Sequence, residues 1–485
     1  MMKVLITHSY FLRFDAKQWG LQQPYAPIGA MYASAVLRNM NCEVSFHDTM
    51  FAEKGDEVIA PLNKHKPDWF IIYDDGFNYL TKMCLTNMRE AAFEMIQLAK
   101  DSGCKVAVSS SDSTDRYEEY LQKGADVVLL GEAEETIQEL IKLDAEQQSW
   151  HHIKGIACKI AIDTICNPRR AVIKDLDNIP FPAWDLIDMA QYKQRWLSSS
   201  GYFSINMGTT RGCPYKCNWC AKPIYGNRYN NRSVENVVEE LKMLKEKYAF
   251  DHVWFCDDIF GLKPGWVKAF ADLLEKENIK FQFKIQSRVD LLLEDKQIAD
   301  LARAGCNNVW VGAESGSQKI LDAMDKGTQV EQIYEATRLL KKHGIKPAFF
   351  IQFGYPGETM KDIEKTMDMI NDLLPEDIGV SVSYPLPGTK FYEQVKHEMV
   401  NKTNWSDSDD LALMFKNTYR ADFYKQLHRY VHKNYRKHQA VETIKLLFNS
   451  PSKSTYFTLK RAASYAWYLP ATIIEKKKLN RLQHE

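Results

Sequence analysis

The sequence predicts an α/β protein in which a doubly wound, Rossmann-like domain is followed by a partial barrel of strand–helix units and a helical C-terminal extension. Two observations predict this fold. Short apolar runs alternate with amphipathic stretches over residues 1–145, and a second alternating series runs over residues 201–400. Such alternation is typical of parallel sheets whose strands are joined by helices. A chain of 485 residues is also long enough for about three domains.

The first domain is expected over residues 1–145. Its strands are expected at Lys3–Thr7, Glu43–Phe46, Trp69–Tyr73, Lys105–Val108 and Val127–Leu130. Helical patterns lie between them, such as Ala30–Met40, Thr86–Ser102 and Thr136–Leu143. A doubly wound sheet binds its ligand beyond the carboxyl ends of its strands, so we look for site residues there.

Residues 146–200 are expected to form a connector, because Ile179-Pro180-Phe181-Pro182 is punctuated by proline. The second domain then follows. Its strands are expected at Tyr202–Met207, His252–Cys256, Lys280–Gln286, Asn308–Gly312, Ala348–Phe353 and Gly379–Ser383. Its helices are expected at Val234–Tyr248, Trp266–Glu277, Asp295–Ala304, Gln332–His343 and Met360–Leu374. Six units in about 190 residues imply an open (β/α)6 barrel, smaller than the closed eightfold form, with its chemistry on the loops after the strands.

Composition argues against several classes of protein. Lys plus Arg equals Asp plus Glu, 63 each, so no general attraction to nucleic acid is expected. No stretch approaches the ~20 apolar residues of a membrane helix, and Met2–His8 lacks the basic flank of a secretion signal. The expectation is a cytoplasmic protein with no transmembrane segment. In the extension, residues 401–485, basic and aromatic residues recur at helical spacing between Tyr424 and His438, which favours a capping helix over RNA contact.

Three cysteines lie close together in Arg211-Gly212-Cys213-Pro214-Tyr215-Lys216-Cys217-Asn218-Trp219-Cys220, a loop expected after a strand. Thiolates hold iron–sulfur clusters, and four would be needed to saturate a 4Fe-4S cluster. With three local thiols one iron keeps an open position that can bind a substrate group. The alternatives are a zinc site, which needs a fourth ligand from far away, or structural cysteines.

This loop resembles that of the radical S-adenosylmethionine superfamily, whose hallmark is three cysteines at this spacing with an aromatic residue before the third. Trp219 takes that place. The resemblance implies that Cys213, Cys217 and Cys220 hold a 4Fe-4S cluster whose open iron chelates S-adenosylmethionine. One electron from the cluster then cleaves a carbon–sulfur bond, and the 5'-deoxyadenosyl radical abstracts hydrogen from a substrate.

Loops after the later strands fit the same resemblance in the expected order. Asp258 is a candidate for the methionine amino group, Arg288 for the methionine carboxylate, and Glu314 for the ribose hydroxyls. Ser287, at the same strand end as Arg288, is a further candidate for cofactor binding. Gly354 permits close approach of the backbone to the ligand. The structural alternatives are a solvated acid, an ion pair of Arg288 and a tight turn at the glycine.

The first domain resembles that of the cobalamin-binding subgroup of this superfamily, which implies a second cofactor. The residues that fit are Pro27-Ile28-Gly29, Asp48 after the second strand, and Gly131-Glu132 after the fifth. The axial-histidine pattern of other cobalamin proteins is absent, because Asp48 is followed by Thr49 and Met50. Ser109-Ser110-Ser111-Asp112 stands where the subgroup often has a Gly-Gly turn, and the third strand ends in Tyr73-Asp74-Asp75. These residues either hydrogen-bond a corrin amide or nucleotide tail or belong to a scaffold that no longer binds cobalamin.

The expected function is therefore radical chemistry on an organic, small-molecule or lipid-like substrate, with cobalamin-dependent methylation or rearrangement as the outcome. Electrons would come from a donor such as flavodoxin or ferredoxin. No catalytic residue beyond the cofactor ligands is identified. The alternative is a methylthiotransferase acting on transfer RNA, whose second cluster would have to use Cys42, Cys84 and Cys104, although their positions do not match that family's motif loops.

Overall fold

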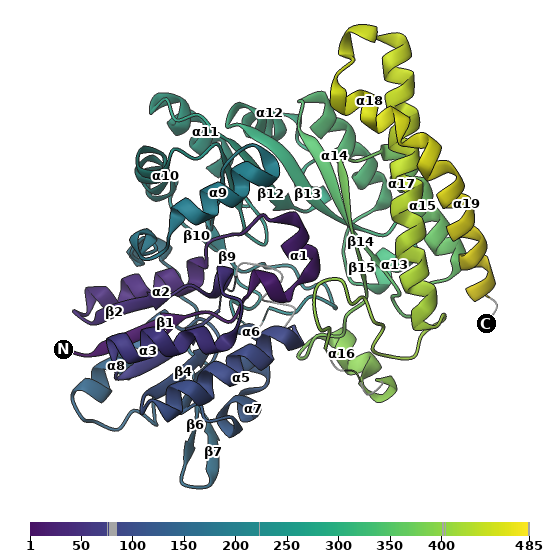
Figure 1. The fold of residues 1–485 in the computed structure, drawn as a ribbon. Helices are drawn as coiled ribbons and strands as arrows, with labels where there is room; N and C mark the ends of the chain where they lie inside the picture. Colours follow the sequence, from purple (N-terminus) through teal and green to yellow (C-terminus); the bar gives the residue numbers. More distant parts are fainter. Residues whose placement is uncertain (75, 77–84, 223, 400–401, 403, 484–485) are drawn as a thin grey trace.

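The structure is a computed structural model that describes residues 1–74, 76, 85–222, 224–399, 402 and 404–483. Two sheets with helices packed around them form the body of the molecule, and long C-terminal helices flank the second sheet (Figure 1). Two residues named above, Asp75 and Cys84, lie outside the described residues.

The first sheet has the strand order β2-β1-β3-β4-β5-β6-β7. The bounds are β1 Lys3–Thr7, β2 Glu43–His47, β3 Trp69–Tyr73, β4 Lys105–Ser109, β5 Val127–Leu129, β6 Ile156–Ile160 and β7 Asp163–Cys166. The first five strands are parallel, in the order of the flavodoxin-like doubly wound sheet. The expected strands of this domain are confirmed to within a residue at each end.

Helices cover both faces of this sheet. Val4 and Ile6 of β1 pack under α2 (Ile28–Asn39) and α8 (Glu134–Ala145), and Leu5 faces the opposite side, under α3 (Ile59–His65) and α5 (Thr86–Asp101). The shorter helices are α1 (Ala16–Leu21), α6 (Ser111–Asp115) and α7 (Tyr117–Gln122).

Residues 146–200 are more regular than the expected connector. β6 pairs antiparallel with β5 and with β7, so the first sheet continues to Cys166, and α9 (Met189–Ser200) follows. The sequence pattern was weak here because β7 is an edge strand, short, polar and largely exposed, without the apolar run that marks a buried strand.

The second sheet consists of parallel strands in the order β15-β14-β13-β12-β11-β8. The bounds are β8 Ser204–Met207, β11 His252–Phe255, β12 Gln282–Ser287, β13 Cys306–Glu314, β14 Lys346–Phe353 and β15 Asp377–Val382. The helices are α10 Val234–Tyr248, α11 Trp266–Lys276, α12 Asp295–Arg303, α13 Gln318–Ala323, α14 Val330–Lys342 and α15 Met360–Leu373. Within the described ranges β8 and β15 do not pair, so the sheet is the partial (β/α)6 barrel that the sequence predicts.

Helix α10 illustrates how local sequence sets these elements. The Ser233 hydroxyl accepts a hydrogen bond from the Asn236 N–H at 3.1 Å and caps the first turn. Val237, Leu241 and Leu244 follow at spacings of four and three, and all are buried. The observed helix bounds agree with the expected ones because the capping serine and the start of the apolar stripe mark the same end of the helix.

The C-terminal extension consists of α16 (Lys390–Val395), α17 (Ala421–Asn449), α18 (Tyr456–Ala463) and α19 (Tyr465–Leu482). The hydroxyl of Tyr435 in α17 donates to the Pro375 carbonyl at 2.7 Å, beside the last barrel strand. Burial lowers the pKa of His432 in the same helix to about 3, so its imidazole is uncharged at neutral pH. This confirms the expected capping helix. Of the helices in the described ranges, none has the length and apolar character needed to cross a membrane.

Candidate functional site

The cysteine loop leaves the barrel as a two-stranded ribbon. β9 (Thr210–Arg211) pairs antiparallel with β10 (Asn230–Asn231), and Cys213, Cys217 and Cys220 lie half-buried between them. Gly212 has φ +81°, and a Cβ built there would lie 2.4 Å from the Arg228 carbonyl oxygen. The turn into the first cysteine therefore requires glycine.

Asn218, inside the cysteine motif, fixes this loop to the barrel. Its backbone N–H donates to the Met324 carbonyl at 3.0 Å, and its side-chain amide donates to Ala323 at 2.7 Å. Its side-chain oxygen accepts from the Tyr355 hydroxyl at 3.0 Å, and its carbonyl accepts from the Phe391 N–H at 3.0 Å. Four contacts with the loops after β13, β14 and β15 thus hold the middle of the motif.

The three thiols share one electrostatic environment. Burial raises the pKa of Cys213, and it raises the pKa of Cys220 to about 12; the charges of the other cysteines and of Asp258 add to both effects. Such thiols stay protonated unless a metal cation stabilises the thiolate. In the part of the chain that the structure describes, no three Cys, His, Asp or Glu side chains form a preformed metal site.

The donor set nevertheless fits a cluster. Three thiols come from one loop, and the indole Nε1 of Trp219 beside them is buried with no hydrogen-bond partner among the described residues. A buried donor of this kind is normally satisfied by something bound in the site.

Arg288, after β12, lies against the same loop. Its guanidinium donates to Cys217 Sγ at 3.6 Å and to the Lys326 carbonyl at 2.8 Å, and it lies 3.8 Å from the Tyr215 ring centroid. It also pairs with Asp290 at 3.0 Å. The expected structural ion pair is therefore present, and it orients a positive charge toward the second cysteine. Ser287 before it is buried at the strand end.

Glu314 and Lys326 form a buried ion pair at the end of β13, with Nζ and Oε1 2.8 Å apart. Glu314 has φ +58°, a left-handed conformation that is costly for a residue with a side chain and that gathers at functional sites. Gly312 leaves the space for the pair, because a Cβ there would lie 2.5 Å from Lys326 Nζ. The ammonium of Lys326 also lies 6.0 Å from the Trp219 ring centroid. The pair therefore joins the strand end to the cysteine motif.

Two adjacent acids after β11 have different roles. Asp257 is fully buried and accepts hydrogen bonds from the Thr209 and Thr210 N–H groups at 2.7 and 2.9 Å. It anchors the strand that leads into the cysteine loop, and burial raises its pKa to about 7. Asp258 is half-buried, and its charge contributes to raising the pKa of Cys213 and Cys220, so it lies near the cysteine loop.

Gly354, after β14, has φ +77° and closely packed surroundings. A Cβ there would lie 3.2 Å from Val382 and 3.3 Å from the Tyr424 ring. Its N–H donates to Glu358 at 2.6 Å. Burial raises the pKa of Glu358 to about 8. The tight turn expected as the alternative is present, together with a buried acid that the sequence did not indicate.

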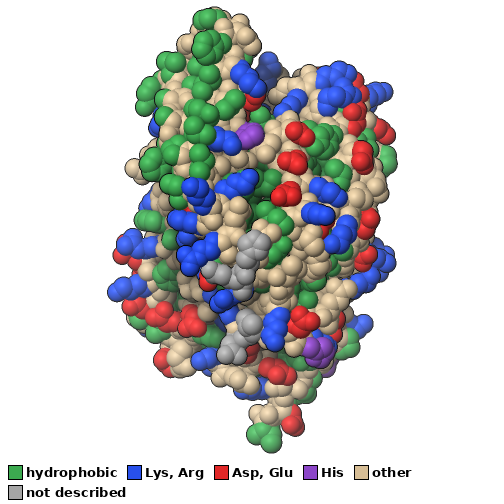
Figure 2. Space-filling view, turned by 90° about the vertical axis from the view of Figure 1, so that its right-hand side faces the viewer, with side chains coloured by type: hydrophobic (Ala, Val, Ile, Leu, Met, Phe, Trp, Pro, Cys, Tyr) green, Lys and Arg blue, Asp and Glu red, His purple; other side chains and the backbone are tan. Residues whose placement is uncertain are grey.

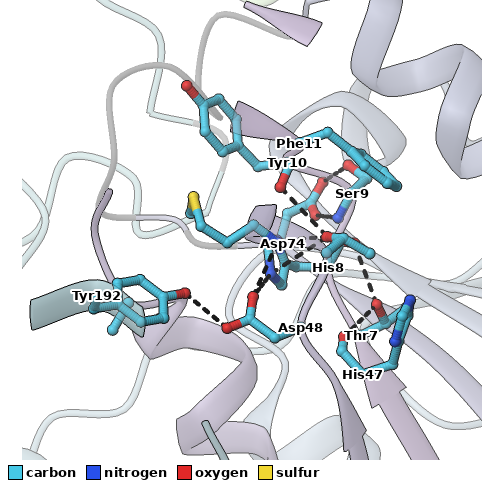
Figure 3. Close-up of polar contacts among 12 residues, drawn as sticks. Thr7, His8, Ser9, Tyr10, Phe11, His47, Asp48, Asp74 and Tyr192 are labelled. Atoms are coloured by element: carbon cyan, nitrogen blue, oxygen red, sulfur yellow. Dashed lines mark hydrogen bonds and ion pairs between the residues drawn. The ribbon is translucent and has the colours of Figure 1, made fainter. Parts of the chain in front are cut away.

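A polar cluster lies at the carboxyl edge of the first sheet (Figure 3). Asp74, after β3, accepts hydrogen bonds from the Ser9 N–H and hydroxyl, after β1, at 2.6 and 2.7 Å. β1 and β3 are neighbours, and the order of strands along the sheet reverses between them. In doubly wound sheets the ligand binds at the carboxyl ends of the two strands at this point.

Asp48 belongs to this cluster. It lies 2.8 Å from His8 Nε2 and accepts a hydrogen bond from the Tyr192 hydroxyl at 2.8 Å, which ties α9 to the sheet (Figure 3). Burial alone would raise the pKa of Asp48, but these hydrogen bonds, the charge of His8 and the Met50 N–H outweigh it and hold the pKa below its ordinary value. Asp48 is therefore an ionised, preorganised acceptor.

Most polar groups of the serine turn after β4 form hydrogen bonds within the first domain. Ser109 is buried, and its carbonyl accepts from the Asp74 N–H at 2.8 Å. Ser110 and Ser113 cap α6 reciprocally at 2.8 and 2.9 Å. The hydroxyl of Ser111 is buried with no hydrogen-bond partner among the described residues. Of these serines, Ser111 offers a free polar atom at the sheet edge.

The loop after β5 connects the two domains. Glu132 and Glu134 pair with Arg211 at 2.6 and 2.7 Å, and all three are buried. Gly131, with φ +77°, makes the turn that precedes these two acids. The sequence prediction placed Glu132 at a cofactor; in the structure its carboxylate binds the arginine that precedes Gly212 and the first cysteine.

Comparison with known proteins agrees with this geometry. Residues 207–370, which contain the three cysteines and the loops after β11, β12 and β13, match the family model of the radical SAM superfamily. These residues form a radical SAM domain.

Relatives of this radical SAM protein include two curated proteins. An uncharacterised methyltransferase of Pyrococcus horikoshii is 30% identical over 58% of this chain and 60% of its own length. The hopanoid C-3 methylase of Methylococcus capsulatus is 23% identical over 92% of this chain and 83% of its own length. The chain matches 45% to 66% of the length of the first four curated relatives.

One solved structure matches the whole fold. OxsB, a cobalamin-dependent S-adenosylmethionine radical enzyme solved with aqua-cobalamin bound, superposes with a TM-score of 0.75 at 16% identity. The match covers all of this chain and 76% of OxsB, and at this identity it shows a shared fold.

Sequence reasoning missed several residues that organise the radical SAM site. Asn218 and Lys326 hold the cysteine loop, and Arg211 ties it to the first domain. The sequence held one signal for these residues: Arg211 and Asn218 are polar residues within the cysteine motif that are not themselves proposed ligands of the cluster. Cys42 and Cys104 precede β2 and β4, at the edge of the sheet opposite the site.

Proposed function

We propose that this protein reductively cleaves S-adenosylmethionine at a 4Fe-4S cluster and uses the radical on an organic substrate, with cobalamin as a second cofactor. The observation that supports this most directly is the half-buried three-cysteine loop held by Asn218 beside the strand ends of a radical SAM barrel. The outcome proposed is methylation, in keeping with relatives named as methyltransferases.

Cys213, Cys217 and Cys220 would hold the cluster. When bound, the cluster and S-adenosylmethionine together supply a one-electron cleavage of a carbon–sulfur bond, which gives a radical able to remove hydrogen from a substrate. Arg288 donates a hydrogen bond to Cys217 Sγ and so places a positive charge beside this thiol. Asn218 keeps the loop against the barrel, beside the strand ends.

The loops after the strands would hold S-adenosylmethionine. The carboxylate of Asp258 suits the methionine ammonium, and Ser287 and Arg288 suit the carboxylate. Glu314 retains a second carboxylate oxygen for ribose hydroxyls while Lys326 holds the first. Gly354 makes the tight turn after β14, where Val382 and the Tyr424 ring take up the space of a side chain. The buried indole N–H of Trp219 offers one further donor.

The carboxyl edge of the first sheet would hold cobalamin. When bound, cobalamin supplies a transferable methyl group. Asp48, the Ser109–Ser111 turn and Gly131 lie at this edge, with His8, Ser9 and Asp74, and the Ser111 hydroxyl is an unsatisfied buried group there. Asp48 is followed by Thr49–Phe51 as a short 3-10 turn, so this loop offers no histidine to cobalt.

The substrate and the electron donor complete the proposal. The substrate is a small organic or lipid-like molecule, and the donor is a small redox protein such as flavodoxin or ferredoxin in the cytoplasm. The methylthiotransferase alternative requires a second cluster near the first. Cys42 and Cys104 lie at the opposite edge of the sheet, and Cys84 lies outside the described residues.

The test is anaerobic reconstitution followed by reduction in the presence of S-adenosylmethionine. We expect about four irons per chain and release of 5'-deoxyadenosine. About eight irons per chain would favour the methylthiotransferase alternative, and no 5'-deoxyadenosine from protein with an intact cluster would contradict the proposal.

Cobalamin binding is tested separately. After incubation with hydroxocobalamin and desalting, we read the cobalt content and the ultraviolet-visible spectrum, and we expect stoichiometric cobalt with no histidine ligand from the Asp48 loop. If protein with an intact cluster retains no cobalt, the first domain is a scaffold and not a cofactor site.

A further inference from the structure

Exposed hydrophobic side chains gather at one end of the C-terminal helices. Of the eighteen large hydrophobic residues that are exposed among the described residues, nine lie between Leu446 and Ile474. Phe448 is 83% exposed, Phe457 79% and Trp467 69%. Figure 2 shows hydrophobic side chains running up the part of the molecule that these helices form. Scattered exposed apolar residues are ordinary, but a contiguous group of this kind marks an interaction surface.

These residues form the tip of a helical hairpin. They come from the end of α17, from α18 and from the first half of α19, which lie together at the end of the extension farthest from the first domain (Figure 1). We call this surface, formed by Phe448, Phe457, Leu459, Trp467, Ile473 and Ile474, the apolar tip.

The side chains of the apolar tip are exposed although helix α19 itself is firmly packed. Its inner face, with Thr472, Glu475 and Leu479, is buried, and the carboxylate of Glu475 accepts from Lys433 of α17 at 2.5 Å. Trp467 and Ile474 are two turns apart on another face, which points away from this packing. The helix is thus anchored on one side while its large side chains face solvent on the other.

Positive charge borders the apolar tip. Between residues 443 and 483 the chain holds eight Lys and Arg residues against a single acid, Glu475, although the whole chain is neutral. Lys460 adjoins Leu459, and Lys476, Lys477 and Lys478 follow Ile474 by one turn of α19, all exposed. Aromatic and aliphatic side chains bordered by lysine are the composition of helices that lie in the interface of an anionic bilayer.

We propose that the apolar tip docks on the surface of an anionic lipid bilayer, with its aromatic side chains among the acyl chains and its lysines at the phosphate groups. A second copy of this chain fits less well, because two such surfaces would bring their lysine clusters together. This inference does not depend on the radical chemistry proposed above, and it gives the protein a place where a lipid-like substrate is concentrated.

The test is flotation of the full-length protein with vesicles of phosphatidylglycerol and phosphatidylcholine, compared with vesicles of phosphatidylcholine alone. We expect binding to the anionic vesicles that weakens as salt is raised, because the phosphate contacts are screened. The double variant Phe457→Ser, Trp467→Ser should bind roughly tenfold or more weakly, since two exposed aromatic anchors are lost. Both side chains are exposed, so the fold should be kept.

Ile162→Ser is the matched control. Ile162 is 94% exposed in the turn between β6 and β7, far from the apolar tip, and its replacement should leave vesicle binding unchanged. Lys476→Glu with Lys477→Glu should weaken binding to anionic vesicles roughly tenfold or more and leave binding to neutral vesicles unchanged. Equal binding by the Phe457→Ser, Trp467→Ser variant and the control would overturn the proposal. A dimer that this double variant abolishes, with no vesicle binding by the unaltered protein, would assign the surface to a second copy.

Discussion

Replacing Arg211 by methionine removes the cation that joins the first domain to the cysteine loop. Its guanidinium is buried, pairs with Glu132 at 2.6 Å and Glu134 at 2.7 Å, and lies 5.2 Å from the Tyr32 ring centroid. Methionine fills a similar volume, so the chief effect is that two carboxylates are left buried together without a counter-charge. Breaking a buried pair in this way costs about 3–5 kcal/mol.

This loss depends on pH. Burial raises the pKa of Glu132 to about 6 although Arg211 opposes the rise, and without Arg211 the pKa is raised further. A carboxyl whose pKa is raised by folding binds more protons in the folded state, so stability falls as pH rises from its ordinary pKa of 4.5 through the folded value. Arg211→Met should therefore be most destabilised at pH 8 and less so at pH 5, where one carboxyl takes up a proton.

The assay is calorimetric unfolding at pH 5 and pH 8. We expect the Tm of Arg211→Met to fall by roughly 5–15 °C at pH 8. Adding Glu132→Gln and Glu134→Gln to Arg211→Met should restore most of the lost Tm. The control is Arg338→Met, which removes an exposed, solvent-screened pair with Glu335 and should leave the Tm nearly unchanged. An unchanged Tm at pH 8, or the same loss at both pH values, would refute this account of Arg211.

Three further predictions concern the site. Gly212→Ala should lower the iron bound on reconstitution, because its Cβ would meet the Arg228 carbonyl, whereas Gly226→Ala, also at positive φ but with nothing within 4 Å, should bind iron almost normally. Asp258→Ala should weaken S-adenosylmethionine binding about tenfold to a hundredfold, measured by equilibrium dialysis, while iron content stays unchanged; unchanged affinity would make Asp258 structural. Cys104→Ala should leave cluster iron at the unaltered level, and a loss of iron would revive the second-cluster alternative.

Much of the fold could be predicted from the sequence because local signals agree with the tertiary structure. Central strands such as β3 are apolar runs buried on both faces, strands such as β12 and β15 alternate buried and less buried residues, and helices such as α10 have a cap and one apolar stripe. β7 was missed because it is a polar, largely exposed edge strand, and β6 was missed because its buried apolar run is only three residues long, Ile156 to Cys158.

The candidate site could be predicted only for residues that a local sequence motif identifies by their type and spacing. The cysteines and the strand-end loops were found in this way. The residues that hold them were not, because their partners are distant in sequence: Asn218 binds Ala323, Arg211 binds Glu132, and Lys326 binds Glu314 across a space that Gly312 leaves. Pairings of this kind are set by the fold and have no local pattern.

The most direct test of the central claim is electron paramagnetic resonance of the reduced, reconstituted protein with and without S-adenosylmethionine. The account predicts a reduced 4Fe-4S signal whose shape changes when S-adenosylmethionine binds the open iron, and no cluster signal after Cys213, Cys217 and Cys220 are all replaced by alanine. A cluster signal that survives the triple replacement, or one that S-adenosylmethionine leaves unchanged, would contradict it.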